Sequence, residues 1–545
     1  MVRSPRFVVL SALLATEALG FTSVRGPIHQ GDRQSLRSVA SFKQTCSRRT
    51  RAWDKRWHCR AARGDMKASA TIIGGEGAGG DDEDLPSRTA MDAQAERICV
   101  LGGGFGGLYT ALRLQKMPWR GRRPIVTLVD KRDKFTFLPL LYEFAVGNAE
   151  LDEVAPTFRE LLMGSGVSFV QACISDVDLG RKEVSLVGAL SDDLDGFMIS
   201  DNADDQRTLK YDKLVLAVGA EPAPGLDRVP GAKENVIPFY SIEDSYRVKQ
   251  AIRELKARVK TMAVARVVVV GGSFAGVELS CNLAAELGKK GAGKVEVTLA
   301  TNSEILSAAT PGNREAGQRR LRETGVRVLT GTRVSQVMEG GVVVLQQGEV
   351  SQDAEASEEE IKADVIIWTA GSQPSSVISS LGIKKDHRGR VEVSPRLQVV
   401  GVGGETSGEV AVDSAVAGVY CLGDVAAVEG LDLPCNAQVA LQQSDYVAYN
   451  IWAEKALRKP LDFRFVNLGE MMNLGGLDGS VATLGGRVKL TGKAAGLARR
   501  AVYAVRMPTN PQRLRAAASA VAGTAFSVTN AIFDKGLDIL DRTKE

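Results

Sequence analysis

Residues 97–107 read Arg97-Ile98-Cys99-Val100-Leu101-Gly102-Gly103-Gly104-Phe105-Gly106-Gly107. A short apolar strand runs directly into a GxGxxG turn, and residues 108–114 are predicted to form a helix immediately after it. Gly102 permits the tight turn, Gly104 lets the backbone approach a pyrophosphate, and Gly107 allows the helix to pack closely on the strand. Free N–H groups at the start of the helix favour an anion. The predicted cofactor-binding loop comprises Gly102, Gly104, Phe105, Gly106 and Gly107.

The chain beyond this loop supplies the acidic residues that a dinucleotide fold uses. Residues 125–129 form a predicted second strand that ends in Asp130, placed to bond a ribose hydroxyl. Much further on, the predicted strand 419–422 ends in Gly423-Asp424. In flavoproteins with two dinucleotide folds, an Asp at this position holds the ribityl chain of FAD. The first fold is therefore predicted to bind FAD.

A second copy of the strand–loop–helix unit follows. The apolar strand 267–270 leads into Gly271-Gly272-Ser273-Phe274-Ala275-Gly276, and a further strand covers residues 295–299. Ser273 replaces the middle glycine, and Ala300-Thr301-Asn302 lacks the acid that would bind a 2′-hydroxyl. Because a carboxylate there repels a 2′-phosphate, its absence makes NADPH at least as acceptable as NADH. The alternative is a degenerate repeat that binds no nucleotide. The predicted NAD(P)-binding residues of this loop are Gly271, Gly272, Ser273 and Gly276.

Two further apolar strands end in glycine, at Gly219 and Gly371, and these residues are predicted to mark the crossings between the two domains and to contact the cofactors. The predicted fold class is α/β, with two Rossmann-like dinucleotide-binding domains and a helical C-terminal tail for membrane association. The expected boundaries are 96–234 for the first part of the FAD domain, 235–400 for the inserted NAD(P) domain, 401–475 for the second part of the FAD domain with the quinone motif described below, and 476–545 for the C-terminal membrane-anchoring region.

The N-terminus has the composition of a targeting segment. Residues 1–21 combine Arg3 and Arg6 with a short apolar run and are predicted to be a signal peptide. Residues 22–90 follow as a predicted transit peptide and disordered linker. This arrangement resembles the bipartite presequences of algae whose plastids lie inside extra membranes, which implies a plastid destination. A simple secretory signal followed by a basic linker remains the alternative.

Charge and composition exclude several classes of function. Residues 1–21 carry a net charge of +1, and residues 22–63 carry eleven Lys/Arg against two Asp. The remainder of this +4 chain therefore carries −6, which gives no support for binding nucleic acid. The chain has three histidines, two of them in the targeting segment, so a Ser-His-Asp hydrolase or a His-ligated metal site is not expected. The cysteines occur singly, without a CxxC pair or a disulfide framework.

Four stretches together resemble one family, the type II NAD(P)H dehydrogenases: residues 102–109, 135–143, 276–278 and 437–443. The resemblance covers roughly residues 96–510. It implies an FAD enzyme on a membrane surface that oxidises NAD(P)H and reduces a lipid-soluble quinone without pumping protons. Residues 463–472 look most like the plant and algal plastid branch, whose members reduce demethylphylloquinone-type precursors and plastoquinone. That branch implies a peripheral position on thylakoid or plastoglobule membranes, and a homodimer is left open.

The stretch 437–443 matches the family's AQxAxQQ quinone motif. On a helix, Gln438 and Gln442 are four residues apart and share one face, so both amides can address a quinone carbonyl. Ala437 and Ala440 are small enough for a flat ring to approach the flavin. Glu278 is predicted to organise the contact between nicotinamide and flavin or to serve a proton path. A solvent-exposed Gln stripe and an ordinary solvated helix Glu are the alternatives.

Eight basic residues and no acids lie between 487 and 515: Arg487, Lys489, Lys493, Arg499, Arg500, Arg506, Arg513 and Arg515. Leu497, Ala501, Ala504 and Val505 share one helical face, so an amphipathic basic helix is predicted to bind an anionic membrane surface. A helix packed on the protein's own surface, or on a second subunit, is the alternative.

Two other functions compete with a quinone reductase. A soluble flavin reductase of the same fold would pass electrons to a small or protein acceptor, as monodehydroascorbate and ferredoxin reductases do. A flavin-bearing structural protein of a lipid surface would leave its flavin oxidised. The missing CxxxxC pair after the first loop argues against a sulfur relay, because residues 108–150 contain no cysteine. Electrons would then pass directly from NAD(P)H to the flavin and on to the acceptor.

Overall fold

The computed structural model describes residues 95–190, 198–199, 206–223, 225–259, 264–288, 294–347, 357–401, 415–483 and 486–518. The predicted signal peptide, transit peptide and linker lie outside these residues, as does the end of the C-terminal tail. Within the described residues, every helix falls short of the length and apolarity that a membrane crossing requires.

The first dinucleotide fold is built on the central strands of an eleven-stranded sheet in the described part of the chain. Strand β1 (Arg97–Leu101) lies between β2 (Ile125–Asp130) and β7 (Lys213–Leu216), and both pairings are parallel. Strand β20 (Ala415–Cys421) joins β7 in parallel from the far end of the sequence. Its arrival brings Gly423-Asp424 to the same sheet edge as the 102–107 loop, because parallel strands end on one side.

The second fold is a five-stranded parallel sheet in the order β12-β11-β10-β16-β9. Strand β10 (Ala265–Val270) precedes helix α11 (Phe274–Leu287), and β11 (Val295–Ala300) pairs beside it. Strands β16 (Val365–Trp368) and β9 (Ile237–Pro238) continue the sheet. The valine-rich β10 is buried along most of its length: Val267 and Val269 belong to the main core, and Val268 and Val270 pack with residues of β13 (Thr332–Met338) and β14 (Val342–Gln347).

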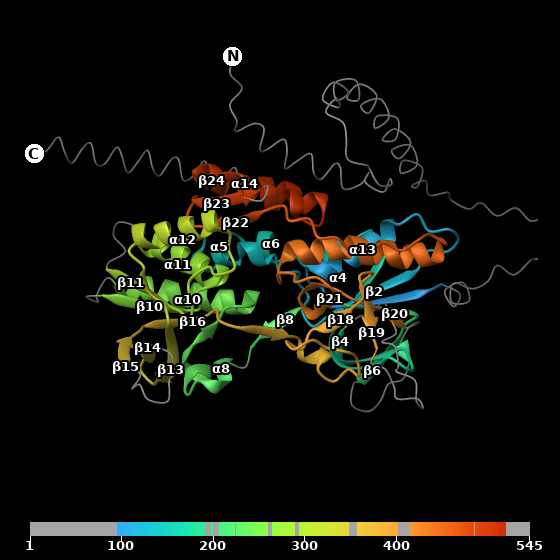
Figure 1. Cartoon of the computed structure of the whole chain (residues 1–545), viewed down its shortest axis with the longest axis horizontal. Coiled ribbons are helices and arrows are strands. Elements are labelled where there is room, and N and C mark those ends of the chain that lie inside the picture. The colour runs from blue at the N-terminus through green and yellow to red at the C-terminus, as the bar shows by residue number, and fades with distance from the viewer. Residues whose placement is uncertain are drawn as a thin grey trace, which may run out of the picture. The chain divides into compact units, whose positions relative to one another are not determined.

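The two folds are joined by a short antiparallel pair, β8 (Ala220–Pro222) with β17 (Ser372–Pro374) (Figure 1). These strands directly follow Gly219 and Gly371, the two positions predicted to mark the crossings. Ala232 and Val236 already pack in the core of the second fold, so the first crossing comes earlier than the predicted boundary at residue 234. The return comes earlier than the predicted boundary at residue 401, because β18 (Val391–Val393) and β19 (Gln398–Val400) already belong to the first sheet. This boundary was placed too late because two three-residue strands carry almost no periodicity.

The C-terminal region contains a small sheet that the motifs did not reveal. Strands β22 (Glu470–Asn473), β23 (Gly479–Thr483) and β24 (Val488–Gly492) form an antiparallel meander. Helix α14 (Lys493–Arg506) packs against this meander, and helix α13 (Ala437–Lys455) packs against α4 (Phe105–Lys116); both α13 and α14 run along the top of the view (Figure 1). The predicted helical tail therefore begins only after a three-stranded sheet.

Candidate functional site

The first loop has the shape that a pyrophosphate requires. Gly102 has a φ of +99°, and a Cβ at Gly107 would lie 1.8 Å from the carbonyl oxygen of Gly102, so both positions need glycine. A Cβ added at Gly104 would meet nothing within 4 Å. The start of α4 thus faces open space at Gly104, with its first N–H groups directed there. Phe105 packs beside the loop, edge to face with Phe135 (5.2 Å between ring centroids).

Asp130 and Asp424 approach this loop from two strand ends. The Gly103 N–H donates to Asp130 Oδ2 (2.6 Å), and the Arg132 N–H donates to Oδ1 (2.8 Å). Each carboxylate oxygen retains a lone pair for a ribose hydroxyl. Burial raises the pKa of Asp424, which follows the left-handed Gly423 (φ +78°). Asp424 is half-buried, so its carboxyl is partly shielded from water but still accessible to a hydroxyl-rich chain.

The second loop repeats this backbone geometry. A Cβ at Gly276 would lie 1.7 Å from the Gly271 carbonyl oxygen, and Gly271 has a φ of +118°. A Cβ at Gly272 would lie 2.7 Å from Thr301 Oγ1, at the end of β11. Ser273 is exposed, and its hydroxyl does not cap α11. That hydroxyl is available to a phosphate, so the residues fit a pyridine nucleotide.

The quinone-motif helix α13 begins beside the Asp424 turn. A Cβ placed on Gly423 would lie 3.7 Å from the Ala440 methyl group, so the first turns of α13 approach the turn closely. Ala437 and Ala440 leave this contact free of bulky side chains, as the sequence suggests. Gln443, which was not assigned a role from the sequence, is fully buried and accepts a hydrogen bond from the Gly423 N–H (2.7 Å).

The amides of Gln438 and Gln442 lie on one side of α13, and both bond a neighbouring extended segment, residues 466–469. Gln442 donates to the Val466 carbonyl (2.8 Å) and accepts from the Val466 N–H (3.0 Å). Gln438 donates to the Gly469 carbonyl (3.2 Å) and accepts from the Leu468 N–H (3.1 Å). Each amide group still has a second N–H, because a primary amide carries two donors. Neither glutamine belongs to a merely solvated stripe.

A buried charged cluster joins the two folds to the C-terminal region. Glu143, on α5 (Leu141–Val146), is fully buried and accepts hydrogen bonds from both Arg499 and Arg500 of α14. The Asn473 side chain donates to the same carboxylate (3.0 Å), and the Asn473 N–H donates to Glu278 Oε1 (2.6 Å). The cluster therefore joins four elements: α5 and α11 carry the two carboxylates, and α14 and β22 carry the residues that bind them.

The pKa values of Glu278 and Glu143 are shifted in opposite directions within this cluster. Burial raises the pKa of Glu278 to about 7; the Asn473 N–H and the charge of Arg499 act against this rise, and Glu143 adds to it. Burial also favours the neutral form of Glu143, but the two arginines outweigh it and hold its pKa below the ordinary range. Glu278 is thus a buried carboxyl that exchanges its proton near neutrality, and it is not a solvated helix residue.

The inward position of the two arginines corrects one expectation. Arg499 is 1% exposed and Arg500 is 9% exposed, so neither can meet a membrane surface. Leu497, expected on the apolar face, is instead 40% exposed. Ala504 on the predicted apolar face is buried as expected, but Arg499 and Arg500 are buried too, because their partner Glu143 lies more than 350 residues earlier in the chain. The alternative of a helix packed on the protein's own surface describes α14.

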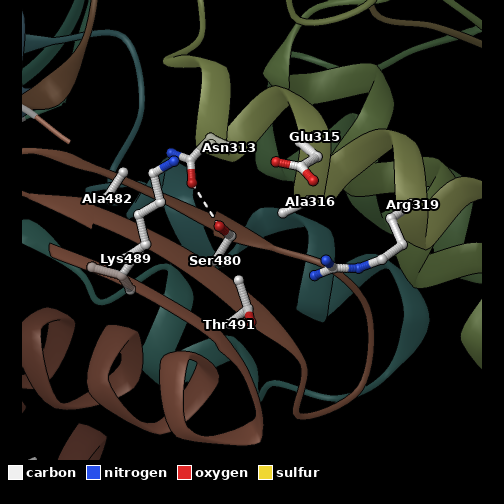
Figure 2. Close-up of a pocket in the computed structure, with 10 residues that line it drawn as sticks. Asn313, Glu315, Ala316, Arg319, Ser480, Ala482, Lys489 and Thr491 are labelled. Carbon is white, nitrogen blue, oxygen red and sulfur yellow. Dashed lines mark hydrogen bonds between the residues drawn. The ribbon is translucent and has the colours of Figure 1, made fainter. Parts of the chain in front are cut away.

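A cavity of about 150 Å³ lies between α12 (Pro311–Glu323) and the C-terminal meander. Figure 2 shows Arg319 and Lys489 on opposite sides of it, with Asn313 accepting a hydrogen bond from the Ser480 hydroxyl (2.6 Å) between them. The predicted cofactor and quinone residues are not among those that line it. Lys489, one of the basic residues that the sequence predicts to bind a membrane, lines this cavity and is exposed.

Comparison with known proteins gives the same picture. The family described as pyridine nucleotide-disulphide oxidoreductase matches residues 96–444. Demethylphylloquinone reductase NdbB of Synechocystis sp. is 36% identical over 420 residues, which cover 76% of this chain and 92% of that protein. Alternative NAD(P)H-ubiquinone oxidoreductase C1, chloroplastic/mitochondrial, of Arabidopsis thaliana is 33% identical over 458 residues, covering 80% and 82%.

The solved structure of NDH2 from Plasmodium falciparum in complex with RYL-552 has the same fold, with a TM-score of 0.64 at 16% identity; 78% of this chain and 98% of that chain are covered. Two dinucleotide loops, each at the end of a parallel strand in its own sheet, with a strand-end Asp returning to the first, define the class of two-domain pyridine-nucleotide flavoproteins. Within that class, the chain belongs to the pyridine nucleotide-disulphide oxidoreductase family and to its type II NAD(P)H dehydrogenases.

Proposed function

We propose that this protein transfers electrons from NAD(P)H through FAD to a prenylated membrane quinone of the demethylphylloquinone or plastoquinone type, without pumping protons. The observation that carries this proposal is the similarity to two NAD(P)H:quinone oxidoreductases along most of their length, at 36% and 33% identity. The two intact dinucleotide loops support it, because one supplies a flavin site and the other a pyridine nucleotide site.

In this proposal the 102–107 loop holds the FAD pyrophosphate, Asp130 holds the adenosine ribose, and Asp424 holds the ribityl chain. Gly271, Gly272, Ser273 and Gly276 hold the nicotinamide nucleotide, with Gly219 and Gly371 at the crossing between the domains. Bound FAD would supply the two-electron chemistry, and the protein would contribute position and electrostatics. NADPH is accepted because β11 ends without an acidic residue.

The quinone end of the site is proposed to lie at the start of α13. Ala437 and Ala440 leave room for a flat ring, and the second N–H of Gln438 or Gln442 donates to a quinone carbonyl. Glu278 supplies or relays a proton, for which a buried carboxyl that titrates near neutrality is suited. The backbone bonds of both glutamines fix the amides in one orientation before the quinone arrives.

We further propose a plastid location on the membrane surface. The plastid-type presequence composition supports the destination, and the exposed Leu497 and Leu514 support contact with lipid. Exposed basic residues in and after α14 would add attraction to anionic headgroups.

Stopped-flow spectroscopy tests the proposed function in two half-reactions. Mixing the FAD-bound protein with NADPH should bleach the flavin absorbance, and adding a prenylated naphthoquinone should restore it. Gln438→Leu should leave the first step intact and slow the second. A flavin that stays oxidised in NADPH would refute the enzyme, and an unchanged second step in Gln438→Leu would move the quinone site elsewhere.

The competing function, a soluble flavin reductase, is tested with the same preparation. It requires rapid reoxidation by a water-soluble acceptor such as ferricyanide, and little or none by the prenylated naphthoquinone in detergent. We expect the naphthoquinone to be the faster acceptor. Rates for NADPH and NADH, measured side by side, will establish the donor preference.

A further inference from the structure

Helix α14 inserts a positive charge into the interior where the two dinucleotide folds and the C-terminal meander meet. Arg499 is 1% exposed, and its Nη2 donates to Glu143. Its other nitrogens, Nε and Nη1, are buried without a hydrogen-bond partner among the described residues. A buried guanidinium with two unpaired donors is unusual, because desolvation of each N–H is normally offset by a partner.

A continuous set of contacts leads from this guanidinium to Glu278. Arg499 binds Glu143 Oε1, the Asn473 side chain binds the same oxygen, and the Asn473 N–H binds Glu278. Asn473 therefore links the two carboxylates: its side chain binds Glu143 and its backbone N–H binds Glu278. Because all these side chains are buried, a charge on one group acts strongly on the other.

The titratable and polar groups around Glu278 come from helices α5 and α14 and from strand β22, and α12 supplies a more distant cation. Helix α5 contributes Tyr142 and Glu143, α14 contributes Arg499 and Tyr503, and β22 contributes the Asn473 N–H. Arg320 of α12 acts on Cys281, which lies one turn further along α11. Arg499 and the Asn473 side chain share Glu143 Oε1, whereas Arg500 binds Oε2 and the Asn148 carbonyl. Arg499 is the arginine whose charge acts against the rise in the pKa of Glu278.

We propose that Arg499 is a positioning residue that brings a positive charge into the buried cluster that holds Glu278, so that the proton affinity of this carboxyl depends on the docking of the C-terminal helix. The proposal deepens the proposed function. It rests on that function only in assuming that the enzyme uses the proton of Glu278 during quinone reduction. The unpaired donors, the shared Asn473 and the burial of all three side chains carry it.

The test is an infrared pH titration of the FAD-bound protein. The C=O band of protonated Glu278 is identified by its absence in Glu278→Gln, and its midpoint should lie near pH 7 in the unaltered protein. In Arg499→Met the midpoint should rise, because the carboxylate loses its cation. Arg499→Lys should restore the original midpoint.

Arg500→Met is the matched control, since it removes the same charge from the same carboxylate, Glu143. Its Glu278 midpoint should stay at the value of the unaltered protein. Equal midpoints in Arg499→Met and the unaltered protein, or an equal shift in Arg500→Met, would overturn the proposal. If Arg499→Met does not fold, the charge-balanced double variant Glu143→Gln with Arg500→Met leaves Arg499 facing Glu278 and should lower the midpoint; an unchanged or higher midpoint there would also overturn it.

Turnover separates this proposal from the proposed function. A shifted midpoint in Arg499→Met, together with normal quinone reduction by Glu278→Gln, supports the electrostatic role of Arg499 and refutes the proton role of Glu278. An unshifted midpoint in Arg499→Met, together with impaired quinone reduction in Glu278→Gln, refutes the electrostatic role of Arg499 and supports the proton role of Glu278.

Discussion

The side-chain oxygen of Gln443 accepts a hydrogen bond from the Gly423 N–H at 2.7 Å, across the contact between α13 and the Asp424 turn. Gln443 is fully buried, and its Nε2 has no hydrogen-bond partner within the described residues. Gly423 has the left-handed conformation that begins this turn. Its bond to Gln443 therefore ties the turn that carries Asp424 to α13.

We expect Gln443→Leu to weaken FAD binding by roughly tenfold, because an unsatisfied N–H at Gly423 costs about 1–3 kcal/mol and loosens the turn. Flavin fluorescence on serial dilution measures the dissociation constant. Gln442→Leu is the matched control, since its amide binds Val466 and does not reach the turn. If Gln443→Leu retains FAD as tightly as the control, the Asp424 turn keeps its conformation without the bond from Gln443.

Gly104→Val should give a folded protein without FAD. The space beside Gly104 is open, so the valine side chain fits the protein but occupies the path of the pyrophosphate. Gly107→Ala is the contrasting variant, because its Cβ would lie 1.8 Å from the Gly102 carbonyl oxygen and the loop itself would distort. Circular dichroism and the flavin absorbance, measured together, separate the two effects. A normal flavin spectrum in Gly104→Val would contradict the assignment of the loop.

The stability of the protein should depend on the ionisation of Glu278. Its pKa rises from the ordinary 4.5 to about 7 on folding, so the folded state binds this proton more tightly than the unfolded state. The resulting stabilisation is complete below pH 4.5 and is lost as the pH rises to 7. Thermal unfolding between pH 5 and pH 8 should show this loss in the unaltered protein and a smaller one in Glu278→Gln. Parallel curves would mean that Glu278 ionises normally.

Membrane binding should depend on the exposed basic residues rather than on Arg499 and Arg500. Changing Lys493, Arg513 and Arg515 to Gln should weaken binding to anionic liposomes by about 3 kcal/mol in total, at about 1 kcal/mol each. The effect should shrink in high salt, and co-sedimentation measures it.

The control for this experiment changes three other exposed basic residues, Arg120, Arg122 and Arg123, to Gln, which alters the net charge equally. If both triple variants lose the same affinity, the attraction comes from overall charge and not from the C-terminal region. Arg499→Gln, by contrast, should lower the free energy of unfolding by about 3–5 kcal/mol, because the buried carboxylate of Glu143 loses one of its two arginine partners.

The two dinucleotide loops could be predicted because their information is local. A strand, a glycine turn and a helix follow one another within a dozen residues, and the φ of +99° at Gly102 is what the motif requires. The family and the α/β fold followed from these motifs, and the comparisons confirm both.

The charged cluster could not be predicted because its members are far apart in the chain. The run of basic residues after position 486 indicated a membrane face, and only the fold brings Glu143 against Arg499 and Arg500. In the same way, the glutamines of the quinone motif find their backbone partners in residues 466–469, an extended segment without a periodic pattern of its own.

The pairing of Glu143 with α14 has a practical consequence for producing the protein. A version shortened before residue 493, as is common when a C-terminal tail hinders expression, would lose both guanidinium groups and leave an uncompensated carboxylate in the interior. Such a truncation removes part of the folded body as well as the tail. Recombinant versions should therefore retain the whole of α14, and any shortening should begin beyond it.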